Sequence, residues 1–136
     1  MENVIACPGC GVKNRLHPTP TGTPRCAKCQ ETLPWVVNAD DLSFDSEARC
    51  GVTVVVDLWA PWCAPCRDVA PVLESIACER AGKIKLVKVN VDECPRTSHR
   101  YRALRIPLMV VLREGEVVDR ITGAMPRGLL EARLLR

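Results

Sequence analysis

The sequence has few aromatic residues, few histidines and little unbalanced charge. Phe, Tyr and Trp make up 4% of its 136 residues, only two histidines are present, and 19 Lys and Arg against 16 Asp and Glu leave a formal net charge of +3. So mild a charge argues against nucleic acid or an anionic membrane as the main partner. We therefore expect no nucleic-acid partner.

Long apolar runs and a secretory leader are also lacking. No apolar run approaches the roughly 20 residues that span a bilayer. The N-terminal stretch MENVIACPGC has neither the basic nor the apolar region of a signal peptide. We therefore expect a cytoplasmic protein without a membrane partner. A monomer is expected as well.

Cysteine, by contrast, is abundant. The nine cysteines form an odd number, so they cannot all pair within the chain, and six of them fall in three Cys-x-x-Cys pairs. Without an export signal, this spacing indicates metal binding or redox catalysis rather than a disulfide scaffold.

The chain divides at about residue 34. Residues 1–34 have no helical or strand periodicity, and a piece this short, below about 40 residues, needs a staple to fold. Residues 35–136 read as strand, helix, strand, helix, strand, strand, helix, which predicts an α/β sandwich with a mixed sheet. The predicted strands are 52–59, 84–91, 108–112 and 117–121, and the predicted helices are about 64–80, 95–103 and 127–135.

Four cysteines in the first segment have the spacing of a zinc site. Cys7, Cys10, Cys26 and Cys29 follow the pattern C-x2-C-x15-C-x2-C. Four thiolates complete a tetrahedral shell, so we predict one structural Zn²⁺ in a zinc ribbon over residues 1–34. Two local disulfides or four free thiols are the alternatives. We expect His17 to be a surface residue, since the shell needs no further ligand.

A third pair, Cys63 and Cys66, lies between a buried strand and a helix. The start of a helix favours an anion, so the pKa of Cys63 should be lowered and its thiolate reactive. Two intervening residues bring the sulfurs within reach of each other, and the pair can cycle between dithiol and disulfide. A metal half-site or two idle thiols are the alternatives.

The stretch VVVDLWAPWCAPC resembles the active-site region of thioredoxins, where the usual text is DFWAxWCGPC. Further matches are Pro71 inside the helix, VKVNVD at 87–92, Ile106-Pro107, the hairpin text REGEVV and Gly123-Ala124. The resemblance covers about residues 35–136 and implies a thioredoxin domain, with a mixed central sheet sandwiched by helices. With its four-cysteine ribbon, the whole chain resembles the zinc-containing thioredoxin 2 class.

The resemblance also implies roles for individual residues. Cys63 attacks a disulfide of a target protein, and Cys66 resolves the mixed disulfide. Asp57 lies beneath the pair and assists proton transfer to and from Cys66, and Lys88 approaches Asp57 from the next strand. An exposed strand-end Asp and an ordinary surface Lys are the simpler alternatives.

A flat groove for an extended target segment is implied as well, with a cis peptide bond at Ile106-Pro107. Trp59 is expected to pack beneath the site rather than contact the target. Three residues beside the dithiol or the groove depart from the family text, namely Ala64, Arg105 and Leu108, and they bear on target preference. The groove residues are Trp62, Ala64, Pro65, Ile106, Pro107, Gly123 and Ala124.

The predicted function is that of a cytosolic protein-disulfide reductase. The resemblance implies electrons from NADPH through a flavin-dependent thioredoxin reductase, with disulfide-bearing proteins as targets. One alternative is a holdase or binding module that releases zinc on oxidation and exposes apolar surface. Another is a disulfide oxidase or isomerase, which the missing export signal argues against.

Three cysteines belong neither to the predicted zinc site nor to the dithiol. Cys78 lies on the polar side of its predicted helix and should be exposed, and Cys50 lies in a turn. Cys94 precedes a helix start, a position that lowers a thiol pKa and makes it a candidate for oxidation. The simpler interpretation, that all three are incidental thiols, is preferred.

Overall fold

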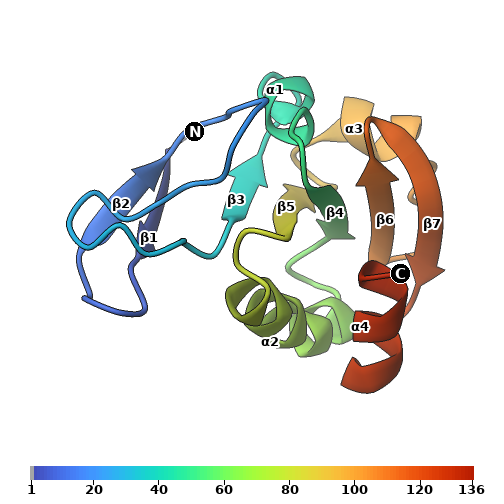
Figure 1. Cartoon of the computed structure of the whole chain (residues 1–136). Coiled ribbons are helices and arrows are strands. Elements are labelled where there is room, and N and C mark those ends of the chain that lie inside the picture. Colours follow the sequence, from blue (N-terminus) through green and yellow to red (C-terminus); the bar gives the residue numbers. More distant parts are fainter. Residues whose placement is uncertain (1) are drawn as a thin grey trace.

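Two sheets organise the chain, a two-stranded sheet at the N-terminus and a five-stranded sheet in the order β3-β5-β4-β6-β7 (Figure 1). The computed structural model describes residues 2–136, so Met1 of the predicted ribbon lies outside it. The strands are β1 Asn3–Ala6, β2 Lys13–Leu16, β3 Val36–Ala39, β4 Thr53–Trp59, β5 Ile84–Asn90, β6 Leu108–Arg113 and β7 Glu116–Thr122. The helices are α1 Phe44–Ala48, α2 Ala64–Glu79, α3 Pro95–Arg100 and α4 Arg127–Leu134.

The five-stranded sheet is mixed. Strands β3, β5 and β4 are parallel to one another, β6 pairs antiparallel with β4, and β7 pairs antiparallel with β6. Strand β4 is buried on both faces, as its run of Val residues predicts for a central strand. Strands β6 and β7 are joined at Glu114 and Gly115, which both have positive φ, 53° and 80°, as a two-residue hairpin turn requires.

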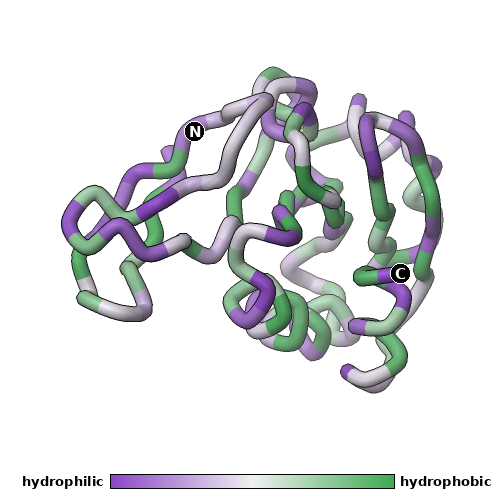
Figure 2. The backbone as a smooth tube through the Cα atoms, in the orientation of Figure 1, coloured by the Kyte–Doolittle hydropathy of each residue, from purple (hydrophilic) through white to green (hydrophobic). Residues whose placement is uncertain are grey.

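Helices cover both faces of this sheet. Helices α2 and α4 lie on one face, and α1 and α3 on the other (Figure 1). Val55 of β4 accordingly packs in one cluster with Leu73 and Leu130, whereas Val56 packs in another with Phe44. Hydrophobic residues concentrate along the central strands (Figure 2). The predicted mixed α/β sandwich is confirmed.

Several predicted boundaries need correction. The short elements β3 and α1 were not predicted, and the helix predicted over 95–103 ends at Arg100. Residues 1–34, for which no strand was predicted, contain β1 and β2. Each of these strands has four residues, which is too few for an alternation of apolar and polar residues to be recognised in the sequence. Backbone hydrogen bonds at the cysteine pairs hold the two strands in place; the Cys7 N–H, for example, donates to the Val12 carbonyl oxygen at 2.8 Å.

The N-terminal hairpin packs against the free edge of the central sheet. The Asn3 side chain donates to the carbonyl of Asn38 at 3.1 Å and accepts from its N–H at 2.7 Å. Strand β3 would otherwise present unpaired backbone groups at this edge. Among the described helices, none is both long and apolar enough to cross a membrane.

One ion pair is buried in the core. Lys85 of β5 is 0% exposed, and its Nζ donates to Glu47 Oε1 at 2.8 Å and to the Glu47 carbonyl at 2.6 Å. The same ammonium lies 4.4 Å from the ring centroid of Trp35. These contacts hold α1, which has only five residues, against the sheet.

Candidate functional site

The dithiol lies where β4 ends and α2 begins. Cys63 is the N-cap of α2, and its Sγ accepts a hydrogen bond from the N–H of Cys66 at 3.2 Å. Pro65 occupies the first turn, where a missing N–H costs no helical hydrogen bond. Cys63 and Cys66 are joined in a disulfide, with their Cα atoms 5.3 Å apart.

This position distinguishes the two sulfurs. Cys63 is 6% exposed and Cys66 is 2% exposed, and both pack with Ala60 against Trp59 and Ile106. In the reduced state, the helix dipole and the Cys66 N–H would stabilise a thiolate at Cys63. Cys63 therefore has the environment of a nucleophile, and Cys66 that of a buried partner thiol.

The loop before β6 closes one side of the site. The Ile106-Pro107 peptide bond is cis, as the resemblance implies, and the Ile106 carbonyl oxygen lies 3.8 Å from Cys63 Sγ. The Gly123 N–H donates to the Pro107 carbonyl at 2.8 Å, which places the β7–α4 connection beside this loop. Gly123 has φ +83°, a conformation that favours glycine.

The predicted groove residues differ in exposure. Trp62 is 67% exposed, and its indole N–H donates to Asp92 Oδ2 at 2.9 Å. Asp92 was not predicted as a site residue. It follows β5, which is parallel to its neighbour β4. A polar residue after such a strand is expected at the same edge of the sheet as the dithiol, and this position could have indicated Asp92 as a site residue. Ala64, Pro65 and Ala124 are also exposed, Ile106 and Gly123 are half-buried, and Pro107 is buried.

Asp57 is an ionisable group inside the core. It is 1% exposed, and neither carboxylate oxygen has a hydrogen-bond partner among the described residues. On β4 it lies between Val55, which packs against α2, and Trp59, which packs against the dithiol, so all three share one face. Burial raises the pKa of Asp57 to about 7. The charge of Lys88 acts against this shift, whereas the charge of Glu74 adds to it.

Lys88 lies beside Asp57 in the sheet, but its ammonium binds another residue. The two residues are register partners on β4 and β5. Lys88 Nζ donates to Glu74 Oε1 of α2 at 2.9 Å and lies 5.7 Å from the ring centroid of Trp59. The predicted approach of Lys88 to Asp57 is therefore electrostatic rather than a hydrogen bond. No sequence signal pointed to Glu74.

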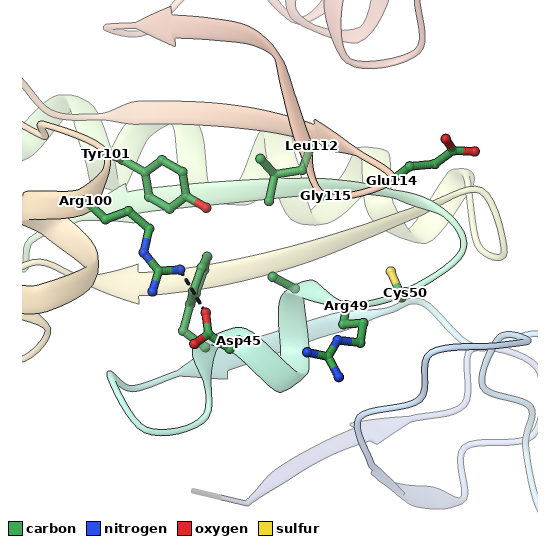
Figure 3. A pocket seen from close by; sticks show the side chains of 10 residues that line it. Asp45, Arg49, Cys50, Arg100, Tyr101, Leu112, Glu114 and Gly115 are labelled. Atoms are coloured by element: carbon green, nitrogen blue, oxygen red, sulfur yellow. Dashed lines mark hydrogen bonds and ion pairs between the residues drawn. The ribbon is translucent and has the colours of Figure 1, made fainter.

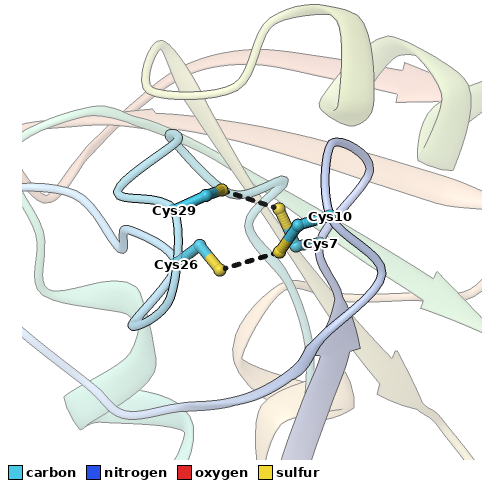
Figure 4. Close-up of side chains that lie close together, drawn as sticks. All are labelled: Cys7, Cys10, Cys26 and Cys29. Atoms are coloured by element: carbon cyan, nitrogen blue, oxygen red, sulfur yellow. Dashed lines mark hydrogen bonds between the residues drawn. The ribbon is translucent and has the colours of Figure 1, made fainter.

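The four N-terminal cysteines converge (Figure 4). Their Sγ atoms all lie within 4.8 Å of one another, and the sulfurs of Cys7 and Cys29 and of Cys10 and Cys26 are 3.6 Å and 3.5 Å apart. Four sulfurs at about 2.3 Å from one zinc ion would be about 3.8 Å apart. The cluster therefore fits one tetrahedral metal ion, and His17 lies exposed outside it.

Two further side chains contact this cluster. Asn14 Nδ2 donates to Cys26 Sγ at 3.5 Å, while its Oδ1 accepts from the Ala27 N–H at 2.9 Å. The N–H of Cys29 and the side chain of Asn14 lower the pKa of Cys26 to about 6, which suits a thiolate ligand. Glu31 Oε2 lies 3.7 Å from Cys7 Sγ. Neither Asn14 nor Glu31 was predicted as part of the site.

The three remaining cysteines lie apart from both clusters. Cys78 is exposed, as predicted, and Cys50 is half-buried. The proposal of a lowered pKa at Cys94 is wrong. Its thiol is 1% exposed and faces the Ala39 carbonyl, and burial raises its pKa despite its place before α3.

Comparison with known proteins agrees with this geometry. The thioredoxin family model matches residues 33–136, a span that leaves out the cysteine cluster. A thioredoxin of Bacillus subtilis (strain 168) is 45% identical over 96 residues, which cover 71% of this chain and 91% of that protein. Thioredoxin C-2 of Corynebacterium nephridii is 45% identical over 98 residues, with the same two shares.

The likeness extends to a plant protein, the chloroplastic M-type thioredoxin of Triticum aestivum, which is 38% identical over 104 residues, 76% of this chain and 59% of that protein. A family match over three quarters of the chain and a bonded Cys-x-x-Cys pair at a helix start lead to one conclusion. The chain belongs to the thioredoxin family, and it is a thiol–disulfide oxidoreductase.

Proposed function

We propose that this chain reduces disulfides of target proteins through Cys63 and Cys66. The observation that carries the proposal is the place of Cys63, whose sulfur caps α2 and accepts the Cys66 N–H at 3.2 Å. A thiolate held there is poised to attack, and the cis-proline loop beside it is where the resemblance implies that an extended target segment binds.

The exchange transfers two electrons in two steps. The Cys63 thiolate attacks one sulfur of the target disulfide, the target S–S bond breaks, and the other target sulfur leaves as a thiolate. Cys66 then loses its proton and attacks Cys63 Sγ, so that the mixed disulfide breaks and the second target thiolate leaves. The target disulfide is reduced, and the Cys63–Cys66 dithiol is oxidised.

Asp57 is proposed to exchange the proton of Cys66. A carboxyl group with a pKa of about 7 is partly protonated at neutral pH and can both accept and return a proton. Its position between Val55 and Trp59, on the face covered by α2, supports this role. Lys88 and Glu74 would set the pKa of Asp57 without touching the reacting sulfurs.

The oxidised pair needs a source of electrons. As the resemblance implies, we propose that a thioredoxin reductase supplies them from NADPH. A cytoplasmic location is proposed with it, because seven cysteines are free and a four-thiol cluster suits a reducing compartment.

One Zn²⁺ is proposed at Cys7, Cys10, Cys26 and Cys29, which would place the chain in the zinc-containing thioredoxin 2 class. The spacing of the sulfurs supports a structural ion in a closed shell of thiolates. When bound, the ion would order the knuckles of the ribbon and take no part in disulfide exchange.

A holdase function is the second candidate, and one observation favours it. Cys7, Leu16 and Cys26 of the N-terminal segment pack in the same apolar cluster as Leu33 and Trp35. Loss of the metal would expose this apolar surface to unfolded proteins.

Single-turnover reduction of a protein disulfide by the pre-reduced chain tests the first proposal. Cys63→Ser should abolish it, and Cys66→Ser should accumulate the mixed disulfide. Turnover that survives Cys63→Ser would refute the reductase function.

Two other measurements test the alternatives. Suppression of aggregation that persists in the Cys63→Ser/Cys66→Ser variant and depends on zinc would support the holdase function. A reduction potential of the dithiol as high as that of cytosolic glutathione would indicate an oxidase.

A further inference from the structure

A hollow lined by three arginines lies beside the dithiol. It has a volume of about 230 Å³ and lies between the α3–β6 connection, the start of β6 and the end of β7. Its lining consists of Arg102, Leu104, Arg105, Leu108, Arg120 and Thr122.

Two residues that line this hollow are adjacent in the sequence to residues of the proposed target groove. Arg105 immediately precedes Ile106, whose carbonyl oxygen lies 3.8 Å from Cys63 Sγ. On the other side, Thr122 immediately precedes Gly123, whose N–H bonds the Pro107 carbonyl. A chain segment in contact with the dithiol would therefore reach the arginines within a few residues.

The positive charge of the hollow is not balanced within the chain. Within residues 2–136, none of the three arginines forms an ion pair with a carboxylate. The guanidinium of Arg120 instead donates to the Tyr101 carbonyl at 2.7 Å. The nearby carboxylate of Asp119 is already paired with Arg133 at 2.6 Å. Three cations in one hollow repel one another, and an external anion would relieve this repulsion.

A second hollow offers a comparison. Its volume is about 470 Å³, and Arg49 and Arg100 are among the residues that line it (Figure 3). Here Arg100 is paired with Asp45 at 2.8 Å, so part of the charge is neutralised internally. This hollow includes Leu112, at the end of β6 remote from the dithiol, whereas the first includes Leu108. Within the described part of the chain, the hollow at the Leu108 end of β6 thus holds three arginines without an ion pair, whereas the second hollow holds one, Arg49.

The hollow also has an apolar rim. Leu104 is 91% exposed, more than any other large apolar residue described in the chain. It lies between Arg102 and Arg105, so the surface pairs one aliphatic contact with several cations. A single exposed Leu is common on protein surfaces, but at this place it offers a bound segment one apolar contact among the cations.

We propose that the arginine hollow binds an acidic segment of the target protein, with Asp or Glu residues a few positions from the target disulfide. This inference rests on the proposed reductase function and adds a substrate class to it. Guanidinium groups bind carboxylates through paired hydrogen bonds, and Leu104 would contact an apolar residue among the acidic ones. Nucleic acid fits less well, because none of the six residues that line the hollow is aromatic and could stack on a base.

The test compares two peptides that share one disulfide ring and differ in their flanking residues, which are Glu in one and Gln in the other. Single-turnover reduction by the pre-reduced full-length protein is followed at low and high salt. We expect the Glu peptide to react faster at low salt, and the ratio of the two rates to approach one as salt screens the charges.

Variants locate the effect. Arg105→Ala should lower the rate ratio by about two- to fivefold, the scale of an exposed ion pair. Arg105→Lys should retain part of the preference, and Arg105→Glu should abolish or reverse it. Arg49→Ala is the matched control, since it removes one exposed positive charge at the remote hollow and should leave the ratio at the wild-type value.

Four results would overturn the inference. Equal rates for the two peptides at low salt would refute it while leaving the reductase function intact, as would a ratio that Arg105→Ala and Arg49→Ala change alike. Reduction of neither peptide would refute the reductase function and the inference with it. A single-stranded RNA oligomer that binds at Arg105 more tightly than the Glu peptide would assign the hollow to nucleic acid instead.

Discussion

Replacement of Asp57 by Asn should make the stability of the protein less dependent on pH. Asp57 is 1% exposed, and burial raises its pKa to about 7. In the unfolded chain a carboxyl group titrates near pKa 3.9, at about the value of a free Asp. Between these two values the folded state binds a proton that the unfolded state does not bind, so the free energy of unfolding falls as the pH rises.

The size of the effect follows from the two pKa values. A difference of about 3 pKa units at about 1.36 kcal/mol per unit gives about 4 kcal/mol. This stability is present below about pH 4, is lost progressively up to about pH 7, and stays lost at higher pH. The amide introduced by Asp57→Asn carries no ionisable proton, so the variant lacks this contribution, and the wild type should lose about 4 kcal/mol more than the variant.

Urea unfolding of oxidised wild type and Asp57→Asn at several pH values between about 4 and 8 measures this difference. Tryptophan fluorescence reports unfolding, and the other titrating groups cancel because both proteins carry them. Stability curves that run parallel across this range would refute the reasoning, since they would mean that Asp57 titrates alike in the folded and unfolded states.

Three further changes test other contacts. Glu74→Gln should lower the pKa of Asp57, because it removes a negative charge that raises this pKa. NMR titration of Asp57 measures the direction of the shift, and the pKa of Asp57 in Glu74→Asp should lie between those of Glu74→Gln and the wild type. Lys85→Met should cost about 3–5 kcal/mol in chemical denaturation, because it leaves Glu47 as an unpaired buried charge. Lys85→Met/Glu47→Gln should recover much of that loss, and failure to do so would argue against the ion pair. Leu73→Ala should cost about 2–5 kcal/mol by opening a cavity under α2, whereas a loss below about 1 kcal/mol would mean that the site is loosely packed.

Local chemistry made much of the site predictable. Cys63 and Cys66 were identified because a dithiol at a helix start depends on residues adjacent in the sequence. The four ribbon cysteines were predicted for the same reason, since each pair forms one short knuckle. The mixed sheet was predicted from the order of the long strands and helices along the chain. These elements are easy to recognise, because each has a clear pattern of apolar residues, as the buried strand β4 does.

Very short elements, and a cysteine whose surroundings depend on a distant contact, were not predicted correctly. The strands β1 and β2 and the helix α1 are four or five residues long, too short for a period to emerge. Cys94 was misjudged because its position before Pro95 suggested a helix dipole, whereas packing against Ala39, 55 residues away, buries it.

The nine cysteines show where the boundary lies. The sequence by itself indicated which cysteines form pairs, because the two residues between the members of a Cys-x-x-Cys pair keep them close along the chain, although folding was needed to bring Cys7 next to Cys29 and Cys10 next to Cys26. Only the tertiary structure decided the surroundings of each pair, because Asn14 reaches Cys26, Ile106 faces Cys63 and Lys88 pairs with Glu74 across long stretches of chain. Burial and charge depend on these distant neighbours, and they set the pKa of Asp57.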